Sequence, residues 1–284
     1  MSQTTLPLVF LVGCSRSGTT LLQSLLAAHP AIWSLPETKF FYYANPCHEP
    51  KRQALGLVSR RLKPSLVQLA QDIQQPRLVE GWPPFPVSLG YGTRRFFGTL
   101  QRLTQEQGKQ VFLEKTPEHF RQLALIDRHL PQAKVIHLVR HGADVAASLY
   151  DLGQRYPRRW GKSHGTLEDC LSHWREAIAA TQQYQSHPQH CVVRYDRLVA
   201  NPSQTLRTLC EFLGLSFSPQ MLEDYQQVGP GLVRPHEQDY KARSSQAIEP
   251  QGLSKFHQVF DPAQQVYVRT ALADYDLDRL FPDA

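Results

Sequence analysis

The hydrophobic pattern of this chain alternates short apolar runs with longer segments of helical period. The strand-like segments, in chain order, are 8–12, 31–37, 111–117, 133–140 and 191–198. Between them lie amphipathic stretches, of which the clearest are Leu21 to Leu26, 167–184 and 205–213. Apolar strands bounded by helices are typical of a sheet covered on both faces. The pattern therefore predicts one α/β domain over residues 1–284, with three layers (α/β/α) and a mainly parallel central sheet.

The junction between the first strand and the first helix carries the most informative motif. Residues Gly13 to Thr20 nearly match the nucleoside-triphosphate loop G-x-x-x-x-G-K-[ST], but Thr19 stands in the position of the lysine. Glycines let backbone N–H groups turn inward, and the start of the following helix faces the same point with its positive dipole end. Together with the Arg16 guanidinium, this predicts a P-loop-like site for one terminal phosphate. An ordinary Gly/Ser turn is the alternative.

Composition excludes few classes of function. The net charge of +6 suits an anionic ligand without indicating nucleic acid, and the basic clusters are typical of solvated surfaces. The only early apolar run, Leu6 to Val12, is too short to span a bilayer. The five cysteines are widely spaced, which favours neither a disulfide framework nor a zinc site. We therefore expect a cytoplasmic protein with no membrane span and no metal site.

Three short motifs near the N-terminus carry a family resemblance. They are the run from Arg16 to Leu21 (RSGTTL), Ala28-His29-Pro30, and Pro36-Glu37-Thr38. In this order they resemble the 5′-phosphosulfate loop of sulfotransferases that use 3′-phosphoadenosine 5′-phosphosulfate (PAPS). The similarity is greatest to the branch that contains the tyrosylprotein sulfotransferases. It extends over residues 8 to 256 and is dense only at the motifs.

The resemblance implies a cofactor site made from several parts of the chain. Arg140, with Ser148 eight residues later, looks like the pair that binds the 3′-phosphate, and this second phosphate site separates PAPS from ATP. Tyr195 is similar to a tyrosine that contacts the nucleotide, although packing would explain it equally well. The residues that would bind the 5′-phosphate are Arg16, Ser17, Gly18, Thr19 and Thr20.

The resemblance also implies catalytic roles. Glu37 has the spacing of the general base in tyrosylprotein sulfotransferases, and Lys115, 25 residues before Arg140, has that of the catalytic lysine. A C-terminal lid over about 230–260 would bring a serine and Lys255 over the phosphosulfate. Ser244 is the favoured serine, with Ser245 as the alternative, because the interval between the lid motifs is shorter here.

Two positions depart from relatives of this family. Small-molecule sulfotransferases commonly place a histidine base two residues after the lysine, but that position is Pro117 here. His119 follows two residues later, and we expect it to point elsewhere. His141 stands where many relatives carry aspartate, and we interpret it as structural.

The acceptor is the least predictable feature. Residues 40–110, with the proline-rich segment 81–86, read as an inserted, largely helical acceptor lid. The hydroxyl of a peptide tyrosine, a sugar, a lipid or a polyketide would each suit the chemistry. The alternatives to a sulfotransferase are a P-loop kinase of a small hydroxylated substrate and a non-catalytic nucleotide-binding module.

Overall fold

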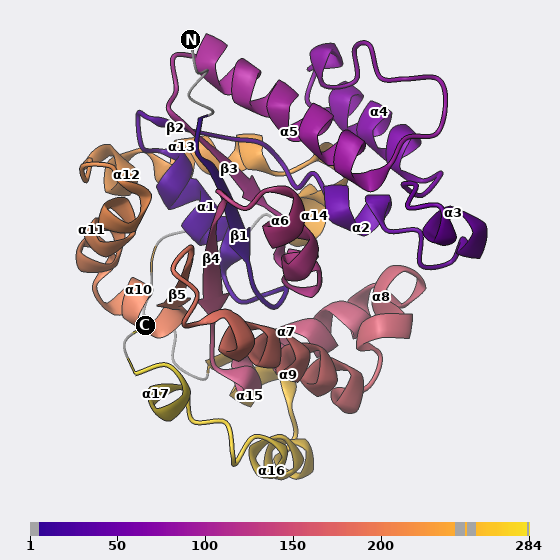
Figure 1. The fold of residues 1–284 in the computed structure, drawn as a ribbon. Helices are drawn as coiled ribbons and strands as arrows, with labels where there is room; N and C mark the ends of the chain where they lie inside the picture. The colour runs from indigo at the N-terminus through magenta and orange to yellow at the C-terminus, as the bar shows by residue number, and fades with distance from the viewer. Residues whose placement is uncertain (1–5, 242–247, 249–253, 283) are drawn as a thin grey trace.

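A computed structural model describes residues 6–241, 248, 254–282 and 284 (Figure 1). Its centre is a sheet of five strands in the order β2-β3-β1-β4-β5, in which every pair of neighbours is parallel. The strands are β1 (Leu8–Val12), β2 (Ile32–Ser34), β3 (Val111–Lys115), β4 (Lys134–Val139) and β5 (His190–Arg194). Because all five run the same way, their carboxyl ends meet at one edge of the sheet, where α/β proteins bind ligands.

Strand β1 shows why both faces of the sheet need cover. All five of its residues are buried, and successive side chains point to opposite faces. Phe10 and Val12 belong to one apolar cluster, whereas Val9 and Leu11 belong to the other. The continuous apolar run in the sequence therefore reflects two cores, one on each side of the sheet.

The smaller core, which contains Leu11, is closed by one layer of helices. Leu22 and Leu25 of the first helix and Leu206 of a later one are fully buried in it. The helices of this layer are α1 (Thr19–Ala27), α10 (Tyr195–Ala200), α11 (Pro202–Leu213), α12 (Gln220–Glu223) and α13 (Tyr225–Val228).

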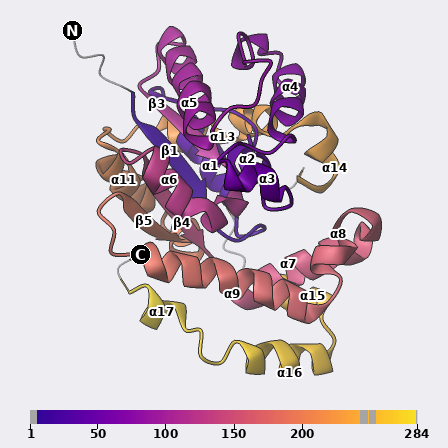
Figure 2. The ribbon, with the colours of Figure 1, turned by 45° about the vertical axis from the view of Figure 1, so that its right-hand side comes forward.

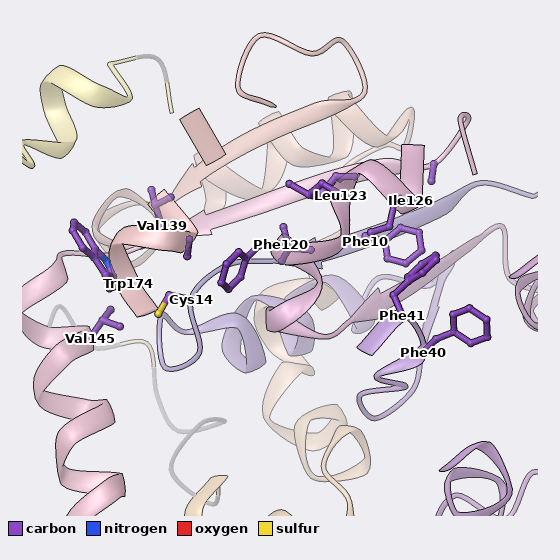
Figure 3. Close-up of a cluster of buried hydrophobic side chains, with 14 of the residues drawn as sticks. Phe10, Cys14, Phe40, Phe41, Phe120, Leu123, Ile126, Val139, Val145 and Trp174 are labelled. Atoms are coloured by element: carbon purple, nitrogen blue, oxygen red, sulfur yellow. The ribbon is translucent and has the colours of Figure 1, made fainter. Parts of the chain in front are cut away.

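The larger core, which contains Phe10, is closed by the other layer (Figure 2). Its members are α2 (Phe40–Ala44), α4 (Leu62–Asp72), α5 (Leu89–Glu106), η2 (Pro117–Gln122), α6 (Leu123–His129), α7 (Gly142–Arg155), α9 (Leu167–Tyr184), α15 (Ser254–Val259) and α16 (Pro262–Ala271). Figure 3 shows Phe40 and Phe41 of α2 beside Phe10 of the sheet, with Phe120 of η2 further along the same cluster. The remaining elements are α3 (Pro50–Ala54), η1 (Pro76–Leu78), α8 (Pro157–His164), η3 (Gly229–Leu232), η4 (Pro235–Glu237), α14 (Gln238–Lys241) and α17 (Leu277–Leu280). Of these, η1 and α17 contribute Leu78 and Leu277 to the larger core.

The predicted three-layer α/β/α fold with a parallel sheet is thus confirmed. Residues 40–110 are largely helical, as expected, but they also contribute to the core of the domain. Side chains such as Leu66, Phe96 and Leu100 enter the larger core, so α4 and α5 form part of the layer that covers the sheet.

Candidate active site

The loop between β1 and α1 has the backbone of an anion cradle. Gly13 has φ +148°, and a Cβ there would lie 2.3 Å from the Leu138 carbonyl oxygen, so only glycine fits. Gly18 has φ +100° and is the N-cap of α1, and Arg16 is left-handed with φ +75°. The loop is also tied to the first residue of η2, shortly after β3, because Gly13 N–H donates to the Pro117 carbonyl at 3.2 Å.

The polar groups of this loop fit a phosphate. Ser17 is 1 % exposed, and its Oγ has no hydrogen-bond partner among the described residues. It lies beside the first turn of α1, where Thr19 and Thr20 are also buried. A buried hydroxyl without a partner is costly. A phosphate oxygen would satisfy it together with the N–H groups at the start of the helix.

A second basic position lies on the other side of the loop, where β4 ends. The Arg140 guanidinium stacks on the Tyr195 ring at 4.4 Å, and a Cβ on Gly18 would lie 2.4 Å from the same ring. Arg16 Nε donates to Ser148 Oγ at 3.1 Å. The structure therefore brings together the loop, Arg140, Ser148 and Tyr195, the residues that the family resemblance assigns to a 3′,5′-bisphosphate.

The position of Arg140 is fixed by its neighbours. Arg140 forms an ion pair with Asp144 at 2.7 Å, and its carbonyl accepts from Trp174 Nε1 at 3.0 Å. The other Asp144 oxygen accepts from Phe256 N–H at 3.3 Å, which joins this site to α15. His141 accepts from Ala143 N–H at 3.3 Å and so caps α7, and burial lowers the pKa of its imidazole. This is the structural role expected of His141.

The two predicted catalytic residues form a buried ion pair. Lys115 Nζ lies 2.7 Å from Glu37 Oε1, and the side chains are 0 % and 8 % exposed. Lys115 is the last residue of β3 and pairs in register with Leu11, just before the loop. Glu37 follows β2, the neighbour of β3.

Sequence reasoning missed three residues around Glu37. Lys39 Nζ lies 3.5 Å from Glu37 Oε2 and 3.0 Å from Glu237. Arg234 donates to the Glu37 carbonyl at 2.6 Å and lies 3.6 Å from Asp72. Lys39 stands two residues after Glu37, so its spacing offered a signal, whereas nothing local marks Glu237 or Arg234.

The segment predicted to form a C-terminal lid, about 230–260, is described only in part. Lys255 lies 3.0 Å from Asp151, and burial lowers the pKa of its ammonium despite the hydrogen bond to Asp151. The positive charge of Arg16 adds to this lowering of the Lys255 pKa. Ser244 and Ser245 lie outside the described residues.

Two further findings concern membrane spans and metal sites in the described part of the chain. None of the helices within the described ranges has both the length and the apolar character needed to cross a bilayer. The same residues contain no cluster of three or more His, Cys, Asp or Glu side chains placed to hold a metal ion.

Known proteins are similar to this chain in sequence and in fold. Protein-tyrosine sulfotransferase 2 of Gallus gallus is 28 % identical over 233 residues, which is 80 % of this chain and 57 % of that protein. Protein-tyrosine sulfotransferase 1 of Homo sapiens is 26 % identical over 228 residues, covering 79 % of this chain and 55 % of that protein. The chain therefore spans little more than half the length of these relatives.

Among solved structures, the sulfotransferase domain from the curacin biosynthetic pathway superposes with a TM-score of 0.61 at 19 % identity, covering 94 % of this chain and 97 % of that one. The sulfotransferase domain from the Synechococcus PCC 7002 olefin synthase gives 0.58 at 24 % identity, with 95 % of each chain covered. The model of the sulfotransferase family matches residues 7–219. The resemblance seen in the motifs is thereby confirmed, and this chain belongs to the sulfotransferase family.

Proposed function

We propose that this protein transfers a sulfuryl group from PAPS to the hydroxyl of an acceptor. The observation that carries the proposal is the order of the predicted site residues along the sheet edge. Glu37 follows β2, Lys115 ends β3, the phosphate loop follows β1, Arg140 follows β4 and Tyr195 follows β5, and the sheet order is β2-β3-β1-β4-β5. A donor lying across the end of β1 would extend its sulfuryl group toward Glu37 and Lys115 and its 3′-phosphate toward Arg140.

The residues that would bind the donor divide into two groups. Arg140 and Ser148 would hold the 3′-phosphate, with Tyr195 against the nucleotide. Arg16 lies between the two phosphate positions, because it already donates to Ser148 from within the loop. The groups for the 5′-phosphate would be Arg16 and the residues Ser17, Gly18, Thr19 and Thr20. Lys255, with a serine of the lid such as Ser244, would close over the phosphosulfate.

The chemistry assigned to the catalytic pair is an in-line displacement. Glu37 takes the proton of the acceptor hydroxyl as the new oxygen–sulfur bond forms. The bond between sulfur and the bridging oxygen breaks, and its electron pair stays on the phosphate of 3′-phosphoadenosine 5′-phosphate (PAP). Lys115 stabilises the negative charge that grows on that oxygen.

The ion pair between Glu37 and Lys115 suggests that the donor binds before Glu37 can act as the base. While Lys115 contacts Glu37, one carboxylate oxygen is occupied by the ammonium. A donor phosphate would draw Lys115 toward its bridging oxygen and leave that carboxylate oxygen for the acceptor. Donor binding would therefore precede activation of the base.

The acceptor is proposed only as a hydroxyl. Two relatives are named protein-tyrosine sulfotransferases, but this chain spans little more than half of their length, so their names do not single out peptide tyrosine. Residues 40–110 are proposed as the region that contacts the acceptor and 230–260 as the lid, within one domain.

The test is a screen with ³⁵S-labelled PAPS against tyrosine peptides, sugars, lipids and polyketide alcohols, in the presence of EDTA. We expect labelled product from at least one acceptor class, and we expect Glu37→Gln to reduce turnover by about 10² to 10⁴ while PAP affinity is kept. Glu211→Gln, which changes an exposed carboxylate on α11, is the control. A Glu37→Gln protein with normal turnover would remove Glu37 from the mechanism.

A further inference from the structure

The first turn of α2, directly after Glu37, is held by side chains from another part of the chain. Lys39 is the N-cap of α2 in a left-handed conformation (φ +52°), and its side chain makes no capping bond. Four consecutive N–H groups nevertheless have acceptors: Thr38 donates to Glu114 Oε1 (3.3 Å), Lys39 to Thr116 Oγ1 (3.1 Å), Phe40 to Thr38 Oγ1 (3.2 Å) and Phe41 to His119 Nε2 (3.3 Å). The unpaired donors of the helix start are thus satisfied by a side-chain network.

Glu114 is the centre of this network. Its Oε1 also accepts from the hydroxyls of Thr38 (2.8 Å) and Thr116 (2.7 Å), and its Oε2 accepts from His119 Nδ1 (3.0 Å). Each hydroxyl gives its single proton to Glu114, so its lone pairs are turned to the backbone N–H groups. All four side chains of the network are at most 1 % exposed.

The hydrogen bonds also fix the protonation of the network. Because His119 Nε2 accepts from a backbone N–H, its proton is on Nδ1 and the imidazole is neutral. Glu114 receives four hydrogen bonds and has no oxygen that donates, so it is a carboxylate. Burial raises the pKa of Glu114, and the hydrogen bonds from His119, Thr116 and Thr38 each act in the opposite direction and lower this pKa. Both nitrogens of His119 are engaged, which makes this histidine unsuitable as an alternative base.

We infer that Glu114 is a positioning residue, which holds Glu37 and Lys115 in contact by joining the chain segments that carry them. Lys115 is the next residue after Glu114, and Glu37 is the residue before Thr38, whose N–H and hydroxyl both bond Glu114. On β3 the two neighbours point to opposite faces, so Glu114 acts from the side opposite the reaction. This role rests on the sulfuryl transfer proposed above.

Glu114→Gln is the sharpest perturbation because glutamine cannot satisfy the network. If its oxygen faces the threonine hydroxyls, its NH₂ faces His119 Nδ1, which must then give up its proton. The proton moves to Nε2, where it opposes the Phe41 N–H. A substitution on β3 that keeps the shape of the side chain therefore removes the hydrogen bond of the Phe41 N–H in the first turn of α2.

The first measurement follows amide hydrogen exchange of residues 38–41. In the wild-type protein we expect these amides to be protected, and in Glu114→Gln we expect their exchange to be at least about 10-fold faster. Thr38→Val removes one hydroxyl and keeps the carboxylate, so it should give a smaller change of the same kind and serves if Glu114→Gln fails to fold.

The second measurement is steady-state kinetics. We expect Glu114→Gln to lower kcat by about 10- to 100-fold, the scale for misplacing reacting groups by about 1 Å, with KM for PAPS near the wild-type value. Glu168→Gln is the matched control, because Glu168 also accepts from two hydroxyls (Ser172 at 3.1 Å and Tyr267 at 2.9 Å) but lies on α9, outside this network and outside the region proposed to contact the acceptor. It should leave kcat unchanged.

Three results would overturn the inference. One is rapid exchange of residues 38–41 in the wild-type protein, another is unchanged exchange in Glu114→Gln, and the third is faster exchange with normal kcat. Absence of sulfuryl transfer by the wild-type protein with every acceptor class would count against the proposed function, whereas the exchange data would still decide whether Glu114 holds the segment.

Discussion

Removing either member of the Glu37–Lys115 pair should destabilise the fold, and removing both should cost less than the sum of the two single losses. The variants are Glu37→Gln, Lys115→Met and the double variant. Each single change leaves one charge in a place where the side chains are 0 % and 8 % exposed, with the two atoms 2.7 Å apart in the wild type. The double change leaves neither charge.

The magnitude follows from the distance and the burial. At 2.7 Å, two unit charges attract by about 6 kcal/mol at an effective dielectric constant of about 20. Desolvation offsets much of this, and the measured cost of breaking a buried pair is about 3 to 5 kcal/mol. Since Lys39 lies 3.5 Å from Glu37, it compensates part of the charge left by Lys115→Met. We therefore expect single losses near the lower end of this range and a coupling energy of about 2 kcal/mol.

The assay is urea unfolding of all four proteins, which yields the free energy of unfolding and the coupling energy. The exposed pair Arg77–Glu106, with side chains 47 % and 42 % exposed, provides a control cycle whose coupling should be below about 1 kcal/mol. If the losses at Glu37 and Lys115 were additive within about 0.5 kcal/mol, the pair would not be coupled in solution and the reasoning would fail.

Three other substitutions test separate parts of the structure. Arg140→Ala should weaken PAP binding by about 2 to 4 kcal/mol in calorimetry, because it removes the guanidinium proposed to pair with the 3′-phosphate. Unchanged affinity would make Arg140 an ordinary structural arginine. Gly18→Ala should also weaken PAP binding, since the new Cβ would lie 2.4 Å from Tyr195 at a φ of +100°, and full affinity would contradict the cradle geometry. Burial and His190 lower the pKa of His137 from 6.5 to about 3. Between these values the unfolded chain binds a proton that the native protein does not, so the free energy of unfolding should fall by up to about 1.4 kcal/mol per pH unit as the pH drops; His137→Gln should flatten this slope, and an unchanged slope would refute the assignment.

The sheet and the loop could be predicted because their signals are local. The apolar run before Gly13 and the glycine spacing indicate a buried strand and a cradle within a few residues of sequence. Lys115 and Arg140 each lie at the carboxyl end of an apolar strand, where parallel sheets place ligand contacts, but it was the family resemblance that assigned their roles.

The surroundings of the catalytic pair could not be predicted because they depend on contacts between distant segments. Arg234 reaches the Glu37 carbonyl across 197 residues of chain, and Glu114 bonds Thr38 across 76. Glu114 also has the spacing of an ordinary strand residue, and only the fold shows that its carboxylate accepts hydrogen bonds from Thr38 and His119. A cytoplasmic location, expected from the cysteines, stays a prediction.

Calorimetry with PAP and ADP in the presence of EDTA tests the central claim most directly. The two ligands share a 5′-phosphate end, but only PAP carries the 3′-phosphate that Arg140 and Ser148 are proposed to bind. We predict that PAP binds far more tightly than ADP and that EDTA leaves its affinity unchanged. Equal affinity for the two ligands would contradict the assignment of PAPS as the donor.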